Sequence, residues 1–234
     1  MTHQRFVLTG RTIWEAASEA ATPVYLAGPR LYTIGTIGGV VAPFGEWHLQ
    51  GLMGGAWAHP IRVLHGWSLE LQQGDDARAL VADSCDLFGS HVVRHYVTPV
   101  LELDWTEFVP DEHAALAGFV DVRNPGPHDV SGRLGIRAEL DLRGCWFGGW
   151  AVPELHAETR DDVLVVTGAG RPFAQRAAAL AAGTDAQWTV TGTTATASLD
   201  FTLPAGSAVR IPISLAVSHA GGPQEAMQLA FQVR

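Results

Sequence analysis

The sequence contains no lysine, so all 15 of its basic residues are arginines. These arginines form no basic stretch, and 24 acidic residues bring the net charge to −9. Proteins that bind nucleic acid or an anionic membrane surface need clustered cations. The charge pattern therefore argues against both kinds of partner. Together with abundant alanine, glycine and valine, the missing lysine is typical of a GC-rich genome.

Cysteine is almost as scarce, with Cys85 and Cys145 too far apart in the sequence to form a local motif. We expect two buried free thiols, with a disulfide between them as the alternative. Long apolar runs are also missing, because no stretch approaches the ~18 residues of a membrane span. The N-terminus lacks the hydrophobic region of a signal peptide. These absences predict a cytoplasmic protein.

What the chain has instead is alternation of apolar and polar residues, the period of half-buried strands. Hydrophobic residues make up 47% of the 234 residues, enough for one sizeable core. Residues 133–142, 197–203 and 209–218 alternate most clearly. We predict an all-β fold over residues 1–222, a large antiparallel β-sandwich (supersandwich) with one or two short helices. Further strands are predicted at 6–9, 31–37, 63–71, 100–108, 119–123, 163–167 and 187–190.

Three segments depart from simple alternation. Ala174–Ala182 is an alanine-rich run before Gly183 and predicts a short surface helix. Pro212 predicts that the last strand lies at a sheet edge or contains a bulge, because proline cannot donate a ladder hydrogen bond. Residues 223–234 begin with Pro after two glycines, as helices often do, although the apolar pattern fits helix and strand equally. We expect this segment to begin a linker helix toward a second domain.

Residues 38–71 are the most informative part of the chain, because tryptophans, histidines and Glu46 lie among several glycines. Tryptophan rings can stack on sugars while histidine and glutamate bond hydroxyl groups. Alternatively, the tryptophans fill the core and the glycines permit close packing. Both interpretations remain open for Trp47, Trp57 and Trp67.

The segment Gly54–Trp67 resembles the GGxWAxPxKLxDGxW pattern in N-terminal domains of glycogen-debranching-enzyme-like proteins, which belong to the six-hairpin glycosidases. Val122–Pro125, Asp141–Phe147 and Leu203–Gly206 resemble later parts of the same domains. The resemblance covers nearly the whole chain and also predicts a supersandwich.

The resemblance implies that the sandwich precedes an (α/α)6 barrel that carries the catalytic carboxylates. The expected function is that of a non-catalytic N-terminal domain of an α-glucan hydrolase. Its expected partner is the C-terminal catalytic barrel of the same parent protein, with an oligosaccharide as a second candidate. The residues proposed for the substrate-cleft or interdomain loop are Glu46, Trp47, His48, Trp57 and His59. Arg62 and His65 stand where the family pattern has lysine and aspartate.

The other groups of acidic, histidine and serine residues in the sequence predict no catalytic residue, no metal ligand and no cofactor. Glycoside hydrolysis needs two carboxylates on either side of the bond, but no pattern pairs any two of the acidic residues. Glu102 and Asp104 should share one strand face and Glu107 the other, which is typical of a solvated edge. His91 and His95, with Asp83 or Asp86 nearby, could ligate a metal, but no known zinc-binding spacing is present and we favour solvated or core-edge histidines. The G-x-S-x-G motif is missing.

Two alternatives come from other functional classes. The first is a free-standing carbohydrate-binding β-sandwich protein, which would hold sugar without a barrel. The second is a mutarotase-like sugar epimerase, in which a histidine and a glutamate act as acid and base. Glu46 and His48 are the candidates for that pair, provided that both face one cleft.

Overall fold

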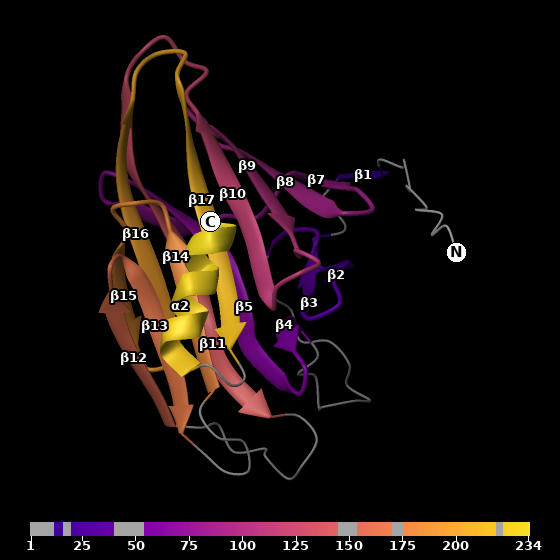
Figure 1. The fold of residues 1–234 in the computed structure, drawn as a ribbon. Coiled ribbons are helices and arrows are strands. Elements are labelled where there is room, and N and C mark those ends of the chain that lie inside the picture. Colours follow the sequence, from indigo (N-terminus) through magenta and orange to yellow (C-terminus); the bar gives the residue numbers. More distant parts are fainter. Residues whose placement is uncertain (1–11, 16–19, 40–53, 145–153, 170–175, 219–221) are drawn as a thin grey trace.

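The computed structural model of the protein describes residues 12–15, 20–39, 54–144, 154–169, 176–218 and 222–234. In these residues two antiparallel sheets pack face to face, and one helix lies against the outside of one sheet (Figure 1). The predicted all-β sandwich is therefore confirmed.

The first sheet has nine strands in the described part of the chain. In spatial order they are β1 (Thr12–Glu15), β7 (Ser84–Leu87), β8 (His91–Val97), β9 (Glu102–Phe108), β10 (Ala115–Arg123), β17 (Ala208–Ser218), β14 (Arg176–Ala182), β13 (Val163–Ala169) and β12 (Glu154–Arg160).

The second sheet also draws on distant parts of the sequence. In spatial order its strands are β15 (Gln187–Thr191), β16 (Thr194–Leu203), β11 (Val130–Gly144), β5 (Ile61–Gln73), β4 (Gly55–Ala58), β3 (Tyr32–Thr36) and β2 (Pro23–Ala27), and β6 (Asp76–Ala79) pairs with β5 off this path.

The core lies between the sheets and follows from the alternation of the strands. In β9, Leu103 and Trp105 are buried between the sheets, whereas Glu102 and Asp104 point outward. In the second sheet Leu134 lies opposite Leu199 in the β11–β16 register, and both belong to the same apolar cluster. The strands predicted from the clearest alternation all form, because each presents one apolar face to the other sheet.

The predicted helix at Ala174–Ala182 is wrong, since residues 176–182 form strand β14. This strand pairs with β13 on one side and β17 on the other. Ala178 and Leu180 face the core between the sheets, while Ala179 and Ala181 lie beneath a helix on the outside. A strand buried on both faces loses its polar residues, and the alternation that identifies a strand disappears with them.

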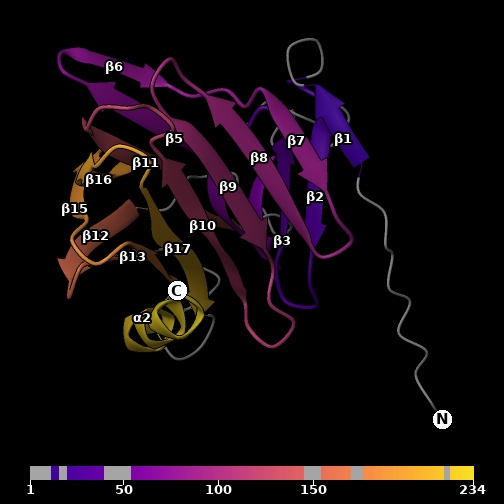
Figure 2. The same cartoon turned by 90° about the horizontal axis from the view of Figure 1, so that it is seen from above.

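The helix over β14 is α2 (Gly222–Val233). The C-terminal segment, whose apolar pattern fitted helix and strand equally, is therefore a helix. It contacts β14, β17, β13 and β10 and lies on the outer side of the first sheet (Figure 2). Ala226 and Ala230 are fully buried against the strands. Ser214 Oγ donates to the Ala230 carbonyl at 2.9 Å, and Arg234 Nη1 donates to the Gly183 carbonyl at 2.8 Å. The helix is thus packed onto the sandwich.

Pro212 does not lie in an edge strand or a bulge, so that prediction is wrong as well. Strand β17 lies inside the sheet between β10 and β14, and its register is regular along both neighbours. Strand β14 ends at Ala182, and the next residue, Gly183, donates its N–H to the Pro212 carbonyl at 2.8 Å. The nitrogen and carbonyl of a strand residue face the same side. The proline nitrogen therefore faces the point where β14 has already ended.

Two smaller expectations concern cysteine and the membrane. Cys85 is a buried free thiol, and burial raises its pKa to about 11, whereas Cys145 lies outside the described residues. In the part of the chain that the structure describes, no helix is long and apolar enough to cross a membrane.

The alanines of β14 allow the helix to approach closely, so a larger side chain should push it away. We expect Ala179→Leu to lower the free energy of unfolding by about 1–3 kcal/mol, because it overpacks the interface beneath α2. Urea denaturation followed by circular dichroism measures this change. Thr189→Leu on the exposed side of β15 is the matched control, and equal losses in both variants would contradict the role of β14.

Candidate functional site

Three rings from neighbouring segments form an aromatic cluster at one end of the second sheet. Tyr32 on β3 lies opposite Trp57 on β4, with ring centroids 6.2 Å apart and planes inclined by 7°. The exposed ring of His59 lies 5.4 Å from the Tyr32 ring, and its Nε2 is 3.1 Å from the Tyr32 hydroxyl. Trp57 itself is 3% exposed. The polar groups that reach solvent are therefore those of His59 and Tyr32, and Trp57 supports them.

A buried ion pair supports this Tyr32–Trp57–His59 cluster. The Arg62 guanidinium lies 5.8 Å from the centre of the Trp57 ring and forms an ion pair with Asp141 on β11, with both side chains 3% exposed. Arg143 Nε also donates to Asp141, at 3.1 Å. A buried charge is stable only when it is paired and hydrogen-bonded. The pair therefore fixes β5 and β11 beside the ring cluster.

His65, on β5, is a titratable group beside this ion pair. Partial burial lowers the pKa of His65, and the nearby positive charge of Arg62 lowers it further. Both effects disfavour the charged imidazolium. His65 is consequently neutral over a wider pH range than an exposed histidine.

The structure brings together two of the five residues predicted for the loop site. The rings of Trp57 and His59 are 6.2 Å apart, whereas Glu46, Trp47 and His48 lie outside the described residues. Sequence reasoning missed Tyr32, Arg62 and Asp141 as members of the cluster. Arg62 and Asp141 did lie in the segments that carried the family resemblance, but no sequence signal connected them to each other.

Trp67 belongs to the core, where it takes part in a charged cluster between the sheets. Its Nε1 donates to Glu107 Oε1 at 2.7 Å, and its ring lies 5.5 Å from that of Trp105. Glu107 forms a buried ion pair with Arg94 on the neighbouring strand β8. The cavity beside these residues has a volume of about 30 Å³, far below the roughly 300 Å³ of the smallest common small-molecule sites. A sugar ring does not fit there.

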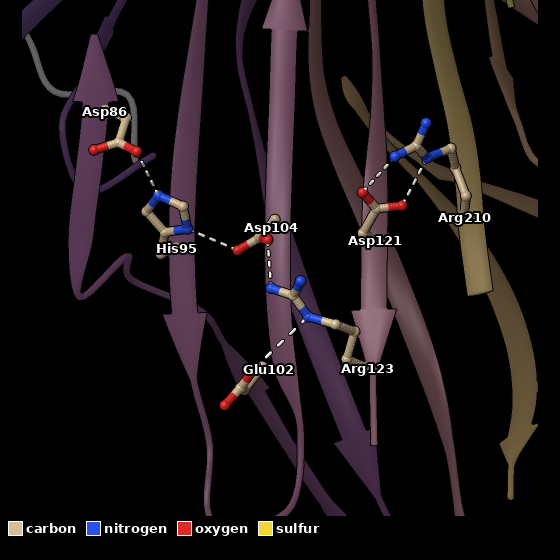
Figure 3. Close-up of polar contacts among 7 residues, drawn as sticks. All are labelled: Asp86, His95, Glu102, Asp104, Asp121, Arg123 and Arg210. Atoms are coloured by element: carbon tan, nitrogen blue, oxygen red, sulfur yellow. Dashed lines mark hydrogen bonds and ion pairs between the residues drawn. The ribbon is translucent and has the colours of Figure 1, made fainter. Parts of the chain in front are cut away.

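The outer face of the first sheet carries a row of charged residues in cross-strand register (Figure 3). His95, Asp104, Asp121 and Arg210 lie opposite one another on β8, β9, β10 and β17. His95 Nδ1 is 2.7 Å from Asp104 Oδ1. Arg210 donates two hydrogen bonds to Asp121 of 2.7 and 2.8 Å. Each of the two carboxylates in the row therefore has an arginine partner, because Arg123 pairs with Asp104 and Arg210 pairs with Asp121.

Other members of this face bear on the strand and the histidines considered in the sequence. Glu102 and Asp104 point outward and Glu107 inward, as predicted, but β9 lies between β8 and β10 and is not an edge strand. His95 Nε2 is 3.2 Å from Asp86 Oδ2, so Asp86 is close to a histidine. Across the residues that the structure describes, no group of three His, Cys, Asp or Glu is arranged to hold a metal ion.

Comparison with known proteins identifies the fold. No protein-family model matches the chain, and no curated protein matches its sequence. A solved structure described as "Putative kojibiose phosphorylase from human microbiome" aligns over 95% of this chain with a TM-score of 0.62 and 10% identity. The chain spans 34% of that protein's length. At this identity the likeness shows the fold alone, a β-sandwich that also occurs within a much longer carbohydrate-active enzyme.

A polysaccharide lyase also aligns, over 70% of this chain and 28% of its own length, at 9% identity and a TM-score of 0.43. This likeness is too weak to support a functional argument.

The Arg62–Asp141 pair should be essential for stability. We expect Asp141→Asn to lower the free energy of unfolding by about 3–5 kcal/mol, because it leaves a buried guanidinium without its counter-charge. Asp200→Asn is the matched control, since Asp200 pairs with Arg133 at the surface and an exposed pair contributes little. Chemical denaturation of both variants measures the difference. Similar stabilities of the two variants would show that the buried pair is dispensable.

The lowered pKa of His65 predicts a pH dependence of stability. Between the folded pKa and the unfolded value of about 6.5 the unfolded chain binds more protons. The contribution of His65 is therefore complete above about pH 6.5 and is lost as the pH falls through the folded pKa. An NMR titration should give a His65 midpoint below 6.5, and His65→Gln should weaken the loss of stability in acid. A midpoint at or above 6.5 would disprove the assignment.

Proposed function

We propose that this chain is the non-catalytic N-terminal sandwich domain of a carbohydrate-active enzyme, packed against an (α/α)6 catalytic barrel. The observation that carries the proposal is the fold match, which covers 95% of this chain but 34% of the longer phosphorylase. A sandwich that forms one part of such an enzyme needs no active site of its own. The resemblance of Gly54–Trp67 to debranching-enzyme-like domains supports an α-glucan hydrolase as the parent protein.

The state of the carboxylates supports a non-catalytic role. Glycosidases use one carboxyl group as acid and a second as base or nucleophile, on either side of the scissile bond. Here Glu107 and Asp141 are buried in ion pairs with arginines. Asp104 and Asp121 on the outer face are bound by Arg123 and Arg210. Arginines therefore hold all four of these carboxylates in place, whereas a glycosidase needs two carboxyl groups that contact the scissile bond.

The Tyr32–Trp57–His59 cluster supports a role for this end of the sandwich in the parent enzyme. The imidazole of His59 and the hydroxyl of Tyr32 can each exchange hydrogen bonds with sugar hydroxyls or with a partner domain. Trp57 is buried, so in this proposal it positions Tyr32 and does not stack on the ligand. Glu46, Trp47 and His48 precede β4 in the sequence, and we propose that they join His59 at the substrate cleft or the domain interface.

The proposal predicts that the isolated 234-residue chain does not cleave glycosidic bonds. Maltooligosaccharides, maltose and kojibiose would be incubated with the folded chain, with and without phosphate, and the products separated by anion-exchange chromatography. We expect neither glucose nor glucose 1-phosphate above the level of a heat-denatured control. Release of either product that scales with chain concentration would overturn the non-catalytic assignment.

A further inference from the structure

A second place on the molecule, on the outer face of the first sheet, has the properties of a ligand site. We propose that an open groove at the ends of β8 and β9 binds a single pyranose ring of a neutral sugar. The groove, called here the β8–β9 groove, is lined by Ser90, His91, Thr106, Phe108 and residues 109–111, with a volume of about 480 Å³. Small-molecule sites commonly measure about 300–1,000 Å³.

Strand register places the groove residues on one surface. His91 lies opposite Phe108, and His95 lies opposite Asp104. Because alternate residues of a strand share a face, His91 and Phe108 point to the same side as His95 and Asp104, which Figure 3 shows on the outer face. Helix α2 contacts β10, β13, β14 and β17, so it covers another part of this sheet and leaves β8 and β9 to one side (Figure 2).

Aromatic rings give the groove an apolar surface. Phe108 lines the groove and is half-buried. The ring of His91 is stacked on that of Phe88, with centroids 4.3 Å apart and planes inclined by 10°. This stacking holds the imidazole in one orientation at the wall of the groove. The C–H face of a pyranose packs favourably against such rings, while its hydroxyls remain at the rim.

Polar groups at the rim match the hydroxyls of a sugar. His91 Nδ1 is 3.0 Å from Ser90 Oγ, which leaves Nε2 for a ligand. Among the residues described, the side chains of Thr106 and Asp111 form no hydrogen bond or ion pair. A hydroxyl, an imidazole nitrogen and a carboxylate can together donate to and accept from vicinal hydroxyl groups.

Charge selects among ligands of this shape. None of the described residues that line the groove is an arginine, Asp111 contributes a negative charge, and the whole chain carries −9. A phosphorylated or carboxylated ligand would meet repulsion without a compensating cation. A neutral pyranose is therefore the class of ligand that the groove fits best.

The groove is independent of the Tyr32–Trp57–His59 cluster, which belongs to the second sheet. It does not depend on the proposed domain role either, because it concerns binding and not turnover. If the groove fails to bind sugar, the domain proposal is unaffected. If the isolated chain hydrolyses sugars, the domain proposal fails and the groove is still testable.

Calorimetric titration and saturation-transfer NMR with maltotriose and with glucose test the site. We expect saturable binding in the millimolar range by the unmodified chain, and much weaker binding of glucuronate. Phe108→Ala should weaken maltotriose binding about tenfold through the lost apolar contact. Thr106→Val, which keeps the shape and removes the hydroxyl, should weaken it about two- to tenfold.

Tyr25→Ala is the matched control, because Tyr25 is an aromatic residue of β2 on the other sheet and is 66% exposed. The Tyr25→Ala variant should bind maltotriose as tightly as the unmodified chain does. Circular dichroism confirms that each variant is folded, and Phe108→Leu replaces Phe108→Ala if the latter unfolds. Absence of saturable binding by the unmodified chain would overturn the proposal. Equal affinities of the unmodified chain and the folded groove variants would overturn it as well.

Discussion

The two sheets depend on an ion pair buried between them. Arg94 and Glu107 pair on adjacent strands of the first sheet, and each also reaches across to the second. Arg94 Nε donates to the Thr36 carbonyl at 3.0 Å, and Glu107 accepts from Trp67 at 2.7 Å. A buried charge without partners costs several kcal/mol. A shift of one sheet along the other would break these hydrogen bonds, so the pair favours one alignment of β3 and β5 against β8 and β9.

In this alignment the first sheet has one face toward the core and one face toward solvent, and the two faces differ in character. Toward the core, Arg94 pairs with Glu107, and the cavity beside them has a volume of only about 30 Å³, so this part of the interior is structural. Toward solvent, the outer face of the first sheet carries helix α2, the charged row that includes His95, and the β8–β9 groove at Phe108. The sandwich thus presents two separate candidate ligand surfaces, one on each sheet. Side chains carried on paired strands are held in place more precisely than side chains on loops, which suits a domain that positions groups for a neighbouring active site.

Alternation in the sequence was enough to predict the fold class, because strands such as β11 and β16 bury one face and expose the other. It failed at β14, where the core covers one face and α2 covers the other. The site was harder to predict. Trp57 and His59 are near in sequence, but Arg62 and Asp141 are 79 residues apart and Trp67 and Glu107 are 40 apart. Contacts of this kind depend on how the sheets pack, and local patterns carry no information about that packing.

We propose that the sandwich works as one domain of a larger carbohydrate-active enzyme. The most direct test is the size of the native polypeptide that contains it, measured in source cells with antibodies against this chain. We predict a polypeptide roughly three times as long as 234 residues, in line with the 34% of the phosphorylase that the chain spans. A native polypeptide of 234 residues that associates with no catalytic partner would contradict it.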